Sequence, residues 1–140
     1  MKKFRLQRNY INLLLLFVII NTLCLLYRNG SFHFSFEVDV YVVVIANLLL
    51  FLLALFGSYR HGRALEDNNP NVFIRSVMGM TVLKFFVLVA AALIYVFTAK
   101  ENRNVPAIII SLVLYILYAV LEVSAAYRMN KTKSNTSKIQ

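Results

Sequence analysis

The stretch SVMGMTVLKFFVLVAAALIYVF, residues 76–97, contains 22 residues, and its only charged side chain is that of Lys84. A helix needs about 20 apolar residues to cross the hydrocarbon core of a bilayer, so this stretch is long enough to span a membrane. A lysine at that depth is costly unless its ammonium group reaches the interface, meets an acid or faces water. Lys84 is therefore either a snorkelling side chain with a packing role or a functional residue.

Three further apolar segments of similar length lie in the 140-residue chain, and 60% of its residues are hydrophobic. The backbone in lipid must satisfy its own hydrogen bonds, so each segment is expected to be a helix. Short connections favour antiparallel neighbours. We therefore predict an all-α membrane protein with four transmembrane helices arranged as two antiparallel hairpins. The predicted spans are about 10–28, 39–58, 73–98 and 105–127, in one domain over residues 1–128. The polar tail over residues 129–140 is expected to be disordered.

Basic residues are distributed unequally between the two ends of this bundle. The end with both termini and the second connection carries eleven, namely Lys2, Lys3, Arg5, Arg8, Arg60, Arg63, Arg75, Arg128, Lys131, Lys133 and Lys138. The opposite end carries three, namely Arg28, Lys100 and Arg103. The positive-inside rule then predicts that both termini of this multi-pass membrane protein lie in the cytoplasm. The net charge of +9 is therefore interpreted as basic residues that fix topology and contact anionic lipid, rather than as a surface that binds nucleic acid.

Three features near the first span have simple interpretations. The N-terminus resembles a secretory signal, but no small-residue cleavage pattern follows it, so a retained first helix is predicted. The single cysteine, Cys24, excludes an internal disulfide and a cysteine-based metal site. The segment SFHFSFEVDV, residues 31–40, alternates aromatic and polar residues. It is either an extended segment with its phenylalanines in the membrane interface or a surface for a ligand or partner.

Lys84 and Glu122 are expected to form an ion pair. Lys84 lies nine residues past Arg75 and Glu122 lies six before Arg128, which places them roughly 13 Å and 9 Å inside the same membrane edge. The difference in depth is less than the length of a lysine side chain. Because the third and fourth spans form a hairpin, Lys84 is expected to reach towards Glu122.

Polar and small residues elsewhere in the spans also indicate contacts between helices. Asn21 and Asn47 each lie thirteen residues from a cytoplasmic arginine, so they are expected at the same depth. They either fix the register of the first hairpin through a hydrogen bond or offer a polar contact to another protein. Ser76 and Gly79, which precede Lys84, are expected to allow close helix packing, either internally or against a partner.

The sequence contains no nucleotide-binding loop, nucleophile elbow, metal-ligand cluster or pair of catalytic carboxylates. Its two histidines, His33 and His61, are assigned to opposite sides of the membrane. We therefore predict no enzyme activity, no catalytic residue, no cofactor and no bound metal ion.

The second span ends in ANLLLFLLALFGSYRHGR, the third contains GMTVLKFFVLVAAALIYVF, and the fourth begins NVPAIIISLVLYIL. These three spans resemble those of the ATP synthase protein I family. The shared elements are Asn47 with a basic exit, Gly79 before Lys84, and Pro106 at the start of the last span. Family members often carry an acidic residue shortly before the lysine. This chain has Met80 and Thr81 there, which makes Glu122 the better candidate for a pairing acid.

The resemblance implies a four-helix membrane protein that assists assembly of the c-subunit ring in the membrane sector of F-type ATP synthase. The c subunit, another subunit of that sector, lipid and a second copy of the chain are its expected partners. The alternatives are an accessory subunit of another complex or a small ion transporter. A Mg²⁺ transporter would use Glu122, Glu37 and Asp39 as ligands. The residues expected to be polar groups in the membrane or partner contacts are Lys84, Glu122, Asn47, Asn21, Gly79 and Arg75.

Overall fold

The structure, a computed structural model, describes residues 2–138 and the side chains of residues 7–135 and 138. The side chains of Lys2, Lys3 and Arg5 and the last two residues of the predicted tail lie outside this part. Four long helices follow one another: α1 (Lys2–Arg28), α2 (Val40–Ala64), α3 (Pro70–Ala99) and α4 (Val105–Ser137). A short 3₁₀ helix, η1 (Lys100–Asn102), follows α3. All four long helices are long and apolar enough to cross a membrane. The predicted all-α membrane class is therefore confirmed.

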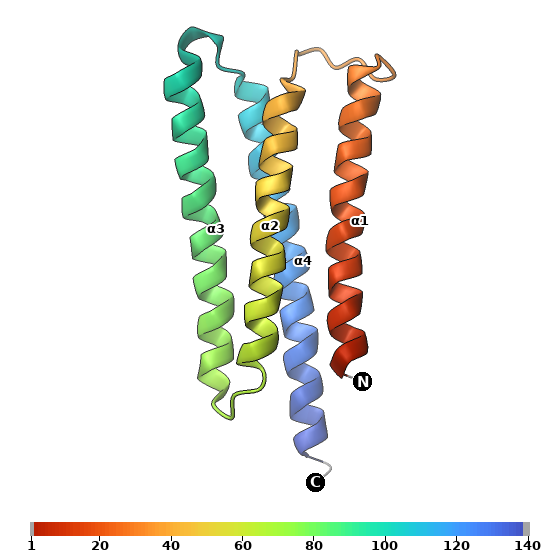
Figure 1. The fold of residues 1–140 in the computed structure, drawn as a ribbon, viewed down its shortest axis with the longest axis vertical. Helices are drawn as coiled ribbons and strands as arrows, with labels where there is room; N and C mark the ends of the chain where they lie inside the picture. The colour runs from red at the N-terminus through yellow and green to blue at the C-terminus, as the bar shows by residue number, and fades with distance from the viewer. Residues whose placement is uncertain (1, 139–140) are drawn as a thin grey trace.

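Consecutive helices run antiparallel, so the start of α1 and the end of α4 lie at the same end of the bundle as the α2–α3 connection (Figure 1). The central helix is α2, which packs against each of the other three. Within the described residues α1 and α3 do not contact each other, and α4 packs chiefly on α2. The bundle thus has a central α2–α4 pair flanked by α1 and α3.

The interior of this bundle is small and its outside is apolar. The buried core is built around Leu50, Ala54 and Tyr118, all 0% exposed. Large apolar side chains are more than half exposed on every helix, including Leu15, Ile45, Phe86 and Ile109. In water such a surface would drive aggregation, whereas lipid is as apolar as these side chains. Each helix therefore presents one narrow face to its neighbours and the rest to the bilayer.

Side-chain caps define where the helices begin. Asp39 accepts a hydrogen bond from the backbone N–H of Tyr41, and Asn69 accepts one from that of Asn71, just before Pro70 opens α3. Asn104 caps α4 by accepting from the backbone N–H of Ala107. Asparagine and aspartate favour such positions because their short side chains satisfy free N–H groups of the first turn. The predicted breaks before the third and fourth spans thus have a structural cause.

The C-terminal end of α4 differs from the sequence-based prediction. The predicted span ends near residue 127 and a disordered tail follows, whereas α4 continues as a helix to Ser137. No glycine or proline interrupts this segment, and Lys133 fixes it to the α2–α3 connection. Its ammonium group donates to the carbonyls of Leu65 and Asp67 at 2.7 and 2.5 Å. The tail is therefore an extension of the bundle through at least nine residues, 129–137.

The connection between α1 and α2, which contains most of the alternating segment 31–40, has neither helix nor strand. Phe34 stacks on Phe36 with ring centroids 5.6 Å apart, and both rings are largely exposed. The hydroxyl of Tyr27, at the end of α1, accepts a hydrogen bond from the backbone N–H of Val38. Asn104 donates to the carbonyl of Glu37 at 2.9 Å, so the two connections at this end of the bundle are joined.

Candidate functional site

A buried ion pair joins α3 to α4. The Lys84 ammonium group contacts Oε2 of Glu122, and the two side chains are 1% and 6% exposed. The expected pairing of these residues is confirmed. Each charge alone would be expensive in this environment, so the pair is the arrangement that makes both tolerable.

His61 of α2 completes this charged cluster, which we define as Glu122, Lys84 and His61. Its Nε2 lies 2.9 Å from Oε1 of Glu122 and its Nδ1 lies 3.1 Å from the hydroxyl of Ser76. With Glu122 ionised, Nε2–H donates to the carboxylate, which leaves Nδ1 to accept from Ser76. The cluster is then neutral overall, and each carboxylate oxygen has one partner from a different helix.

His61 was not among the predicted site residues, because it follows Arg60 in the basic segment just beyond the predicted second span. The side chain is in fact 1% exposed, unlike that of its neighbour Arg60. One sequence signal pointed inward: His61 follows Gly57 by four residues, so the two share a helix face. A small residue one turn before a polar residue is typical of a close, polar contact between membrane helices.

Gly57 is the small residue that admits the Glu122 carboxyl group. A methyl group in its place would lie 3.1 Å from Cδ of Glu122, closer still to Oε1, and 3.5 Å from the Met80 side chain. The residue singled out from the sequence, Gly79, has a different position. It is exposed, and a methyl group there would have nothing within 4 Å. Gly79 therefore faces outward, and Gly57 takes the internal packing role that was one of the two alternatives for Gly79.

A second, uncharged cluster joins α1, α2 and α4. The hydroxyl of Tyr118 donates to Oδ1 of Asn47 at 2.8 Å, and both side chains are 0% exposed. The amide of Asn47 donates to the backbone carbonyl of Phe17 at 3.4 Å. We call Asn47, Tyr118 and the Phe17 carbonyl the neutral cluster.

The expected hydrogen bond between Asn21 and Asn47 is not formed. Asn21 instead donates to the Phe17 carbonyl of its own helix at 3.0 Å. The two asparagines therefore donate to the same backbone carbonyl, that of Phe17, and not to each other. A buried tyrosine, which the sequence analysis did not consider, takes the position of the predicted partner of Asn47.

Both clusters are built on one face of α4, because Tyr118 and Glu122 are four residues apart. Arg75, by contrast, is exposed and lines an open groove of about 630 Å³ between α2 and α3 together with Arg60 and Arg63. Ser76 also lines this groove, so the charged cluster lies directly behind it.

The carboxylates considered as Mg²⁺ ligands are far apart. Glu37 and Asp39 precede α2, at the end of the bundle opposite the α2–α3 connection (Figure 1). Glu122 is seventeen residues beyond the start of α4 at that same end, a rise of roughly 25 Å. The part of the chain that the structure describes contains no group of three or more acidic, histidine or cysteine side chains placed to hold a metal ion.

Comparisons with known protein families, with curated proteins and with solved structures find no match for this chain.

Proposed function

We propose that this chain is a non-catalytic protein of the bacterial inner membrane that assists assembly of the F-type ATP synthase membrane sector, with the c subunit as its partner. The observation that carries the proposal is a lysine inside the membrane whose charge is held by a carboxylate on another helix. A lysine held in this way has the chemistry to bind an intramembrane carboxylate on a second protein when the internal pair opens.

The position of α3 supports such an exchange. This helix lies at the side of the bundle and packs on α2 and α4 but not on α1. Its outer surface carries the bare backbone of Gly79 and the exposed rings of Phe85 and Phe86. A partner helix packing at Gly79 would lie one to two turns from Lys84 along the helix. In this mechanism a c-subunit carboxylate replaces Glu122 while the c-subunit hairpin is being added to the ring.

The proposed orientation rests on the distribution of charge. The end that carries both termini and the α2–α3 connection has eleven of the lysines and arginines, and the opposite end has three. Short basic segments remain in the cytoplasm during insertion. The charged cluster is therefore assigned to the cytoplasmic half of the membrane, where Lys84 would meet a newly inserted partner.

Site-specific photocrosslinking in native membranes tests the proposal. A photoreactive residue at Phe86, 65% exposed and two residues past Lys84, is expected to capture the c subunit. Val18 of α1 is the matched control, because it is 53% exposed and similarly deep, ten residues past Arg8. It is expected to capture only lipid or unrelated proteins.

Two further results bear on the same point. Deletion of the gene is expected to reduce the amount of assembled c ring on native gels, and genes for ATP synthase subunits a and c are expected beside it. Absence of any ATP synthase subunit from the Phe86 adducts, together with normal ring assembly in the deletion strain, would refute the proposal.

A further inference from the structure

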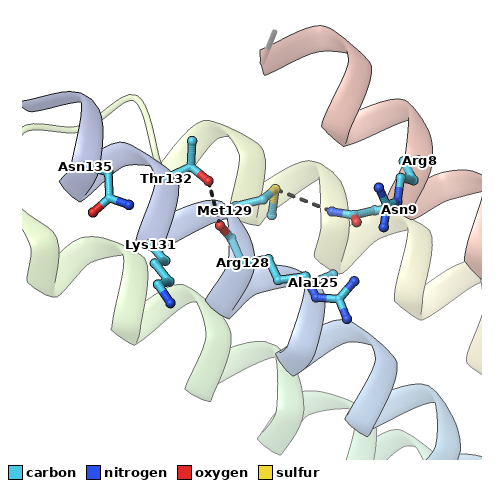
Figure 2. A pocket seen from close by; sticks show the side chains of 8 residues that line it. All are labelled: Arg8, Asn9, Ala125, Arg128, Met129, Lys131, Thr132 and Asn135. Carbon is cyan, nitrogen blue, oxygen red and sulfur yellow. Dashed lines mark hydrogen bonds between the residues drawn. The ribbon is translucent and has the colours of Figure 1, made fainter.

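A basic pocket of about 330 Å³ lies between the beginning of α1 and the end of α4 (Figure 2). Three cationic side chains line it, namely those of Arg8, Arg128 and Lys131. The amides of Asn9 and Asn135 also line it. It is separate from the charged cluster, which lies between α2, α3 and α4, and the proposed function makes no use of it.

The positive charge of this pocket is not neutralised by the chain. No acidic side chain lines it. The sequence has no aspartate or glutamate in α1, and none in α4 after Glu122. Within the described residues, the only ion pairs are those of Glu122 with Lys84 and His61. Three cations gathered around one cavity repel one another, so an anion from outside the chain would stabilise this arrangement.

The pocket lies at the level where the apolar parts of both helices end. In α1 the continuous apolar run begins just after Asn12, and in α4 it ends near Tyr127. The phosphate groups of a bilayer lie at this boundary between hydrocarbon and water. A hydrogen bond of 3.5 Å from the amide of Asn9 to the sulfur of Met129, dashed in Figure 2, joins the two helices beside the cavity.

We propose that this pocket binds the phosphate of an anionic membrane phospholipid, such as phosphatidylglycerol. The planar guanidinium groups of Arg8 and Arg128 are suited to paired hydrogen bonds with phosphate oxygens, and Lys131 adds charge. The two amides are suited to headgroup hydroxyls. Basic pockets between transmembrane helices on the cytoplasmic side are typical sites for such headgroups.

The groove between α2 and α3 provides a matched comparison. It also has three basic residues, Arg60, Arg63 and Arg75, but Asp67 lies among them and it is more open. General attraction to an anionic surface would involve both sets of basic residues equally. A specific headgroup site would depend on the α1–α4 pocket alone.

Native mass spectrometry of the purified full-length protein with defined lipids tests this proposal. Phosphatidylglycerol is expected to remain bound under conditions that remove phosphatidylcholine. The triple variant Arg8→Gln/Arg128→Gln/Lys131→Gln is expected to lose at least tenfold in retained phosphatidylglycerol. The variant Arg60→Gln/Arg63→Gln/Arg75→Gln removes the same charge and is expected to stay within twofold of the unchanged protein.

A second variant keeps every charge and therefore separates the pocket from surface potential. Ala125 lines the cavity, so Ala125→Phe fills it and is expected to reduce retained phosphatidylglycerol by a similar factor. Equal losses of bound phosphatidylglycerol in the two triple variants would overturn the proposal. Full retention of the lipid by Ala125→Phe would also overturn it. Inorganic phosphate is not expected to displace the lipid. Displacement by millimolar phosphate would assign the pocket to a soluble anion instead.

Discussion

The two polar clusters of this protein connect the same central pair of helices to opposite sides of the bundle. The charged cluster connects α2 and α4 to α3 through Glu122, Lys84 and His61. The neutral cluster connects them to α1 through Asn47, Tyr118 and the Phe17 carbonyl. Within the described residues, α1 and α3 have no contact of their own. Each outer helix is therefore attached by one of these clusters, by apolar packing on the central pair and by a further polar contact with α4. That contact is Asn9 to Met129 for α1 and the Tyr115 hydroxyl to the Thr81 carbonyl for α3.

The clusters differ in what happens when one member is lost. A neutral hydrogen bond between membrane helices contributes about 0.6 kcal/mol on average, because its groups find other partners when it breaks. A buried charge without its partner costs several kcal/mol. Removal of one member is therefore expected to destabilise the bundle more at the connection to α3 than at the connection to α1.

The largest predicted effect tests the ion pair. Glu122→Gln leaves Lys84 charged and without its carboxylate, and we expect a loss of about 3–5 kcal/mol in the free energy of unfolding. The double change Glu122→Gln/Lys84→Met removes both charges and is expected to cost less than half as much. Reversible unfolding in mixed micelles measures both. Equal losses from the single and double changes would show that the pair does not compensate these charges.

Arg75, an exposed arginine on the same helix as Lys84, is the control for this prediction. Arg75→Gln also removes one charge, but this side chain is exposed and has no ion pair within the described residues. The expected change in the free energy of unfolding is below about 0.5 kcal/mol. A loss comparable to that of Glu122→Gln would mean that net charge, rather than burial, determines the effect.

The next effect tests the space around the carboxyl group. Gly57→Ala places a methyl group against Glu122, and we expect a loss of about 1–3 kcal/mol from overpacking. Gly79→Ala makes the same chemical change where nothing lies within 4 Å. It is expected to be neutral or to stabilise the helix by up to about 1 kcal/mol. Thermal unfolding of the two variants measures this difference. Equal changes in stability for Gly57→Ala and Gly79→Ala would contradict the role of Gly57.

A smaller effect is expected in the neutral cluster. Tyr118→Phe and Asn47→Ala are expected to be coupled by about 0.6–1.7 kcal/mol in a double-mutant cycle of unfolding free energies. Asn21→Leu is the control, because the Asn21 amide donates only within its own helix, and a change below about 0.5 kcal/mol is expected. A coupling energy as large as that between Lys84 and Glu122 would remove the contrast between the clusters.

The smallest effect concerns the outer edge of the charged cluster. Ser76→Ala removes one neutral hydrogen bond to His61 and is expected to cost about 0.5–1 kcal/mol. Thr22→Val removes a hydroxyl that donates within its own helix at 2.9 Å, so no measurable loss is expected. Unfolding in mixed micelles distinguishes them. A loss above 2 kcal/mol for Ser76→Ala, about twice the upper value expected for a neutral hydrogen bond, would show that Ser76 is an essential part of the charged cluster.

Depth along the helices was sufficient to predict the contact between Lys84 and Glu122, because both distances were counted from the same membrane edge. It was not sufficient for the partner of Asn47. Asn21 lies at the expected depth, but its amide is directed along its own helix, and Tyr118 reaches Asn47 from α4 instead. Depth fixes one coordinate of a side chain, whereas a contact also depends on the rotation of each helix about its axis.

The sequence by itself determined the number of helices and the approximate position of each apolar span, although not the end of α4, because hydrocarbon thickness sets span length and lipid leaves no other partner for the backbone. Its charges also indicated an orientation. Only the tertiary structure decided which face of each helix points inward. In lipid the outside is as apolar as the inside, so residue pattern does not separate the two faces. The roles of Gly57, His61 and Tyr118, and the outward position of Gly79, follow from packing around α2 and α4, and the sequence signalled only the shared face of Gly57 and His61.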